Sequence, residues 1–227
     1  MSYNTHGGGA STNYNGLNFE KDTSLKNFLF AHKFVVDTRG CVSYDGRIIG
    51  FYLPKHDLYK WLKQYHPEYT YDNSKRYLPD ECFVNTVTKE AIIIEKKFQN
   101  GEGSVDEKLT TCDFKKKVYQ KMFRAIGYET IKYVFIFNDW FKQPVYADSL
   151  AYALSCGCSY FFNSPPLELF GLKIKNGNLL FPKNTWCHQM SEEKVERKRL
   201  EILNSNIDGE EIEKIENKPS FEVISLF

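Results

Sequence analysis

The sequence has little net charge and no long apolar run. Lys and Arg number 30 against 29 Asp and Glu, which leaves a net charge of +1. This balance argues against a protein that binds nucleic acid through bulk electrostatics alone. No apolar run approaches the ~20 residues that span a bilayer, and the N-terminus lacks the basic and apolar regions of a signal peptide. We therefore expect a cytoplasmic protein with no membrane partner.

The six cysteines lack the regular spacing of a small disulfide-stapled scaffold. They lie in apolar or helical segments, which is typical of buried free thiols. Cys156, Cys158, Cys187 and His188 offer zinc-ligating side chains, but their spacings differ from the Cys-x-x-Cys pattern of zinc sites. Free thiols are therefore the expectation.

What the chain does have is enough apolar material for one sizeable core. Its 227 residues are 42% hydrophobic and 16% aromatic, which is ordinary globular composition. We expect a single domain over 1–227, with a flexible Gly-rich arm at 1–16, a core at 17–163 and a C-terminal extension at 164–227. Basic residues cluster at 115–124 and 194–199, where solvated helix faces are the ordinary explanation.

Apolar periodicity predicts the secondary structure. Helices are expected over 17–32, 55–65, 105–125, 146–156 and 192–203. β-like runs lie at 34–36, 41–44, 48–52, 82–87, 91–98, 131–137 and 159–162. The first three runs, separated by short turns, resemble a meander, and a helix before the apolar run 131–137 implies a crossover to a parallel strand. We therefore expect an α/β fold with a mixed central β-sheet flanked by helices.

Charged residues stand at the ends of two neighbouring β-runs. Asp80 precedes one run, and Glu95, Lys96 and Lys97 follow three isoleucines in the next. Burying so many charges without partners is costly, so we expect them at a strand end, where they can share a cation and a phosphate. Asp80 and Glu95 are hard oxygen ligands suited to Mg²⁺. Lys97 shares a strand face with Glu95, whereas Lys96 points to the other face.

This pattern resembles the signature of the PD-(D/E)XK nuclease superfamily. Pro79-Asp80 followed by Glu95-Lys96-Lys97 matches its motif, and Gln99 extends the match to the E-x-K-x-Q variant. The acid-x-Lys triplet alone is weak, because it begins at Glu95, Asp106, Asp113, Glu192, Glu196 and Glu216. Only the first follows an apolar β-run, with Pro-Asp one hairpin upstream and a helix and buried strand downstream. That context carries the resemblance.

The resemblance implies a PD-(D/E)XK restriction-endonuclease-like core and assigns roles to its residues. Asp80, Glu95 and the backbone carbonyl of Lys96 would hold Mg²⁺, and Lys97 would face the attacking water and the scissile phosphate. The metal neutralises the phosphate and lowers the pKa of a bound water.

Three neighbouring residues have less definite roles. Glu20 is a further candidate, because many of the resembling enzymes bring a carboxylate from the first helix to the metal; a solvent-facing glutamate is the alternative. Gln99 is expected to orient its loop or touch the DNA backbone, against the alternative of a strand-end polar residue. Glu81 should face away from Asp80 and lie outside the metal site.

Two further segments, 8–20 and 103–109, are similar to parts of type II restriction endonucleases. With the core, the resemblance covers roughly residues 7–140. The Asn/Lys/Ile/Tyr-rich composition also resembles members from A·T-rich bacteria that cut long A·T-rich palindromes.

The leading hypothesis is a Mg²⁺-dependent type II restriction endonuclease. It would act as a homodimer on palindromic double-stranded DNA, because a two-fold symmetric site needs a two-fold symmetric reader. The alternatives are a structure-selective repair or junction nuclease of the same fold and a non-catalytic DNA-binding module.

Overall fold

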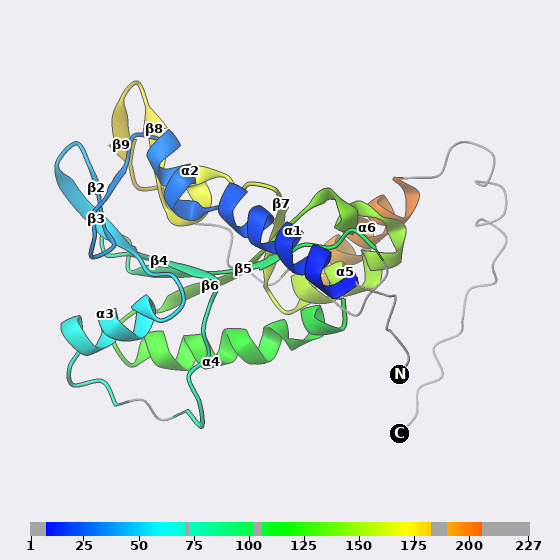
Figure 1. Ribbon diagram of the computed structural model, residues 1–227, viewed down its shortest axis with the longest axis horizontal. Coiled ribbons are helices and arrows are strands. Elements are labelled where there is room, and N and C mark those ends of the chain that lie inside the picture. Colours follow the sequence, from blue (N-terminus) through cyan, green and yellow to red (C-terminus); the bar gives the residue numbers. More distant parts are fainter. Residues whose placement is uncertain (1–7, 71–72, 102–105, 183–189, 206–227) are drawn as a thin grey trace, which may run out of the picture.

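The computed structural model describes residues 8–70, 73–101, 106–182 and 190–205. Its centre is a seven-stranded mixed sheet flanked by helices (Figure 1). The expected α/β fold with a mixed central sheet is therefore confirmed. Within the described segments, no helix has the length and apolar character needed to cross a bilayer.

The seven strands lie in the sheet in the order of the chain. They are β1 (Val35–Val36), β2 (Cys41–Tyr44), β3 (Arg47–Tyr52), β4 (Glu81–Asn85), β5 (Glu90–Lys97), β6 (Thr130–Phe137) and β7 (Ser159–Phe162). Neighbours from β1 to β5 pair antiparallel, whereas β5, β6 and β7 pair parallel. The predicted meander and the predicted crossover before residues 131–137 are both present. A separate hairpin pairs β8 (Lys173–Lys175) with β9 (Asn178–Leu180).

Helices cover both faces of the sheet (Figure 1). The α-helices are α1 (Gly8–Asp22), α2 (Leu25–Ala31), α3 (Asp57–Tyr65), α4 (Cys112–Arg124), α5 (Ala147–Ser155) and α6 (Glu192–Asn204). The short 3₁₀ segments are η1 (Asp106–Thr111), η2 (Asp139–Lys142), η3 (Pro144–Tyr146) and η4 (Leu167–Phe170). In α6, Arg199 pairs with Asp148 of α5 at 2.6 Å, which joins the C-terminal extension to the rest of the fold.

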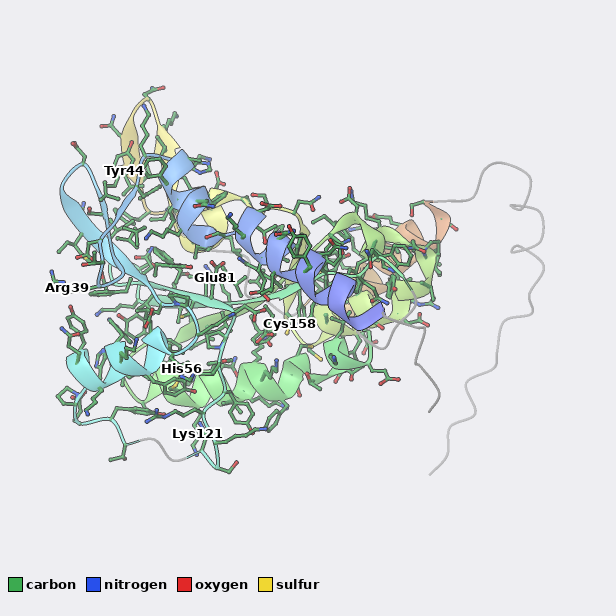
Figure 2. All side chains as sticks on the ribbon, in the orientation of Figure 1. Arg39, Tyr44, His56, Glu81, Lys121 and Cys158 are labelled. Atoms are coloured by element: carbon green, nitrogen blue, oxygen red, sulfur yellow. The ribbon has the colours of Figure 1, made fainter. Side chains whose placement is uncertain are left out.

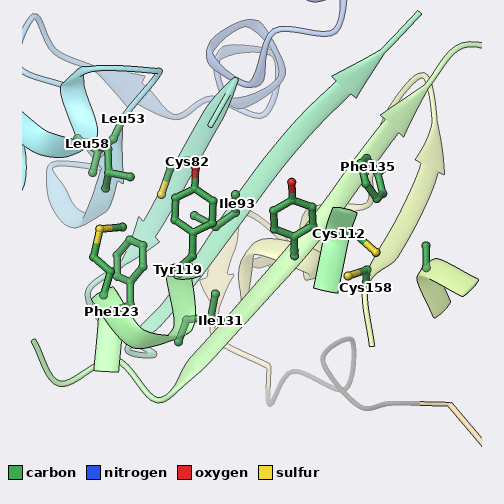
Figure 3. Close-up of a cluster of buried hydrophobic side chains, with 14 of the residues drawn as sticks. Leu53, Leu58, Cys82, Ile93, Cys112, Tyr119, Phe123, Ile131, Phe135 and Cys158 are labelled. Atoms are coloured by element: carbon green, nitrogen blue, oxygen red, sulfur yellow. The ribbon is translucent and has the colours of Figure 1, made fainter. Parts of the chain in front are cut away.

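Strand β5 divides the interior into two cores. Ile93 packs in the core of α3 and α4, whereas Ile92 and Ile94 pack in the core of α1 and α2. Successive side chains of a strand point to opposite faces, so this division is set by the sequence. Figure 3 shows part of the first core, which includes both Ile93 and Tyr119 of α4. The same alternation decides where each charged residue at the end of β5 points.

The N-terminal region differs from the prediction. The helix expected over 17–32 begins at Gly8 and is divided after Asp22, so the arm expected over 1–16 is helical from Gly8; residues 1–7 lie outside the described part. At the end of α1, the Thr23 hydroxyl and the Thr23 backbone N–H both donate to the Phe19 carbonyl, at 2.6 and 2.9 Å. The helix expected over 105–125 starts with η1 and becomes α-helical at Cys112.

Candidate active site

The pairing of two strands brings the predicted site residues together. Asp80 lies just before β4, and Glu95 and Lys97 lie at the C-terminal end of β5. Because the strands are antiparallel, with Glu81 opposite Ile94, the start of β4 lies beside the end of β5. The Lys96 backbone N–H donates to Asp80 Oδ2 at 2.7 Å, which fixes the Asp80 carboxylate at this strand end.

Three oxygen atoms converge on the ammonium group of Lys97. Lys97 Nζ lies 3.0 Å from the Lys96 carbonyl oxygen, 3.1 Å from Glu95 Oε2 and 3.9 Å from Asp80 Oδ2. These oxygens belong to the three residues that the sequence predicts as metal ligands. Glu95 is only 4% exposed, whereas 19% of the Lys97 side chain reaches solvent. The Glu95 carboxylate is therefore buried, and the Lys97 side chain is the more exposed partner of this ion pair.

Lys115, which sequence reasoning did not select, also reaches the site. It lies in the first turn of α4, and its Nζ is 3.2 Å from Glu95 Oε1. The cluster around it was interpreted as a solvated helix face. A helical wheel could have found it, because Lys115 lies one turn before buried Tyr119 and so shares its inward face.

The floor of the site is buried and aromatic. Tyr133 of β6 and Tyr119 of α4 lie beneath Glu95, and burial together with the negative charge of Glu95 raises the pKa of both phenols. The Tyr119 hydroxyl donates to the Tyr77 carbonyl at 3.0 Å. Among the residues described, the Tyr133 hydroxyl is buried without a hydrogen bond, and Glu95 Oε1 is buried with Lys115 Nζ 3.2 Å away. Such a setting has a low effective dielectric, which strengthens the electrostatic interactions of Glu95.

Lys96 and Glu81 lie on the opposite face of the sheet, as strand alternation predicts. Lys96 Nζ is 2.7 Å from Glu81 Oε2 and donates to the Glu20 carbonyl at 3.0 Å. The Glu81 carboxylate (labelled in Figure 2) also accepts from the Leu25 N–H at 3.1 Å and the Tyr52 hydroxyl at 2.8 Å. This buried network attaches α1 and α2 to the sheet, so Glu81 lies outside the candidate site.

The Glu20 carboxylate also lies on the α1 side of the sheet. Its Oε2 is 3.4 Å from Lys55 Nζ, and the two residues line a cavity of about 430 Å³ together with Asp80 and Lys96. Glu20 therefore lines a cavity with Asp80, whereas Glu95 and Lys97 do not line that cavity.

Gln99 holds the loop that follows β5. Its Nε2 donates to the Gly101 carbonyl at 2.8 Å, and its backbone N–H donates to Asn138 Oδ1 at 3.2 Å. Asn138 returns a bond to the Gln99 carbonyl at 2.8 Å. Through these contacts, Gln99 holds the loop after β5 against Asn138.

Metal-ligating side chains are dispersed in the part of the chain that the structure describes. There, no three His, Cys, Asp or Glu residues gather as a metal-binding group. The five cysteines of that part are free thiols. Cys187 and His188, the other candidate zinc ligands, lie outside it. Two carboxylates and a carbonyl remain a sufficient protein contribution for Mg²⁺, which usually keeps several waters.

The chain matches no family model, no curated protein and no solved structure.

Proposed function

We propose that this protein is a Mg²⁺-dependent nuclease with a PD-(D/E)XK core, acting as a type II restriction endonuclease on double-stranded DNA. The observation that carries the proposal is the convergence of Asp80 Oδ2, Glu95 Oε2 and the Lys96 carbonyl on one ammonium group. Ion pairs that only stabilise a fold do not require a backbone carbonyl beside two carboxylates at a strand end.

The donor set fits a magnesium ion. Asp80, Glu95 and the Lys96 carbonyl supply hard oxygen atoms, and Lys97 Nζ already lies among them, so the space suits a cation. Glu95 Oε1, buried 3.2 Å from Lys115 Nζ, is a further carboxylate oxygen that the metal would reach once that ammonium group moves away. When bound, the metal would neutralise a phosphate and lower the pKa of a water molecule.

The protein's own groups have separate tasks in this proposal. Lys97, whose side chain is partly exposed, donates to an oxygen of the scissile phosphate and offsets the negative charge that develops there as water attacks phosphorus and the P–O bond breaks. The Lys96 N–H keeps the Asp80 carboxylate in place. The aromatic floor excludes water beneath Glu95, so the site needs little reorganisation during the reaction.

The segment before Asp80 supports DNA as the substrate. Lys75 lies over the ring of Tyr77 at 5.2 Å, and Arg76 lies over the ring of Tyr59 at 5.4 Å. The ring contacts position these two cations, which shortly precede Asp80 in the sequence. In this proposal they contact phosphates of the DNA. Phosphate contacts fix the position of a duplex relative to a protein.

The element order is a second line of support. The antiparallel strands β3 to β5, the helix α4 and the parallel strand β6 follow one another as in the core that the sequence resembles. A homodimer on a palindromic duplex belongs to the proposal, because two equal cuts at a two-fold symmetric site require two equal catalytic centres.

Sequencing the fragment ends after digestion of several plasmids in Mg²⁺ tests the proposal. We expect discrete fragments whose ends share one palindromic sequence. Cuts confined to branched or mismatched substrates would instead identify a structure-selective nuclease of the same fold. Binding to duplex DNA with no cleavage in Mg²⁺ would identify a non-catalytic DNA-binding module.

A further inference from the structure

The Glu95 carboxylate is held between two ammonium groups that come from different elements. Oε2 faces Lys97 Nζ of β5 at 3.1 Å, and Oε1 faces Lys115 Nζ of α4 at 3.2 Å. Only Lys97 belongs to the sequence motif. Nothing about a strand-end motif requires a helix to send a second lysine to the same buried carboxylate.

We propose that Lys115 is a second phosphate-contacting residue of this site and that it couples DNA binding to metal binding. The inference rests on the nuclease function proposed above. Asp80 and Glu95 carry two negative charges, and Lys97 and Lys115 carry two positive charges, so the four side chains sum to zero. A divalent cation raises the sum to +2, which matches the two negative charges that a phosphodiester develops when hydroxide attacks it.

The coupling follows from competition for Glu95. An ammonium group 3.2 Å from Oε1 opposes a divalent cation approaching the same carboxylate. If Lys115 turns toward a DNA phosphate, that opposition falls and Glu95 becomes available to the metal. DNA and metal must then each increase the affinity of the protein for the other by the same factor.

The neighbouring lysines show that this placement is particular to Lys115. The Lys116 ammonium donates to the carbonyls of Cys156 and Gly157 at 2.9 and 2.8 Å, which joins α4 to the turn after α5. Lys117 pairs with Asp113 at 2.7 Å on the outer side of the helix, with 70% of its side chain exposed. Lys115 is 32% exposed, so it contacts Glu95 and also reaches solvent, where a phosphate would arrive.

The test measures binding of Ca²⁺, a hard divalent cation, by calorimetry with and without a short DNA duplex. The proteins are the wild type, Lys115→Met and the matched control Lys117→Met. In the wild type and the control, we expect the duplex to tighten Ca²⁺ binding by about tenfold, within the usual range of coupling between two sites. In Lys115→Met, we expect tighter Ca²⁺ binding without DNA and loss of most of that enhancement.

A purely structural role for Lys115 would not tighten metal binding in the absence of DNA. Suppose that the duplex tightens Ca²⁺ binding by the wild type, and that folded Lys115→Met and Lys115→Gln show the same Ca²⁺ affinities and the same enhancement. The inference is then wrong and the proposed function stands. If wild-type Ca²⁺ binding is absent, or is unchanged in Glu95→Gln, the proposed function fails together with the inference.

Discussion

The Lys96 ammonium and the Glu81 carboxylate form a 2.7 Å ion pair with side chains only 2% and 7% exposed. The pair lies on the face of β5 opposite Glu95 and Lys97. Adjacent lysines therefore have different tasks, because Lys96 joins the sheet to the N-terminal helices while Lys97 faces the candidate site. This separation allows stability and catalysis to be tested independently.

Replacing Lys96 with methionine should lower the free energy of unfolding by about 3–5 kcal/mol, because it leaves Glu81 as an uncompensated buried charge. The double variant Glu81→Gln/Lys96→Met should regain much of this loss, since glutamine keeps an oxygen for the Leu25 N–H. Urea unfolding measures both values. If Lys96→Met and the exposed-site control Lys117→Met have equal free energies of unfolding, Lys96 does not stabilise a buried Glu81 charge.

Glu95→Gln and Asp80→Asn should each reduce cleavage in Mg²⁺ by orders of magnitude, because each removes a charged oxygen ligand. Both variants preserve side-chain shape, so duplex binding without metal should persist or tighten as negative charge leaves the site. Single-turnover cleavage rates and duplex titrations measure the two effects. A near wild-type rate in either folded variant would mean that the site is misplaced.

Lys97→Met should abolish cleavage, whereas Lys96→Met should retain it once rates are corrected for the folded fraction. Strand alternation is the reason, since only Lys97 shares a face with Glu95. The comparison is best made at low temperature, where the destabilised Lys96 variant remains folded. The reverse ranking would show that the catalytic face of β5 has been assigned wrongly.

Stability should fall as the pH rises above about 10. Burial and the charge of Glu95 raise the pKa of Tyr133 above its ordinary value of 10.0, so the folded protein keeps this phenol neutral while the unfolded chain loses its proton. The contribution is complete below pH 10 and is lost as the pH rises toward the folded value. Tyr133→Phe should make this decline shallower, as measured by urea midpoints between about pH 8 and pH 11. An unchanged slope would contradict the burial of this phenol.

Duplex affinity should fall steeply with salt, because each phosphate neutralised by a lysine or arginine releases counterions.

Sedimentation of the free protein should show a dimer, as a palindromic target requires. A species that stays monomeric on its duplex would favour the structure-selective nuclease.

The strands of the central sheet and the proximity of Asp80, Glu95 and Lys97 could be predicted because they depend on local patterns. Isoleucines on both faces of β5 predict that other elements pack against both faces of the sheet. Glu95 and Lys97 are two residues apart in that strand and therefore share one face. Glu20 could not be placed, because its direction depends on where α1 ends and on the pairing with Lys55. The contact of Lys115 with Glu95 could not be predicted, because the helical pattern shows only that Lys115 faces inward, and its partner is set by the packing of α4 over β5. The early start of α1 at Gly8 was not predicted, because the Gly, Ser, Thr and Asn residues in the first half of this helix have low helix propensity.

The most direct test of the account is the conversion of supercoiled plasmid by the purified protein in Mg²⁺, compared with Glu95→Gln and with an excess of EDTA. We predict that the wild type linearises the plasmid in Mg²⁺ only, and that Glu95→Gln, folded to the same extent, leaves it supercoiled. Cleavage that persists in EDTA, or equal cleavage by the two proteins, would contradict a metal-dependent nuclease centred on Glu95.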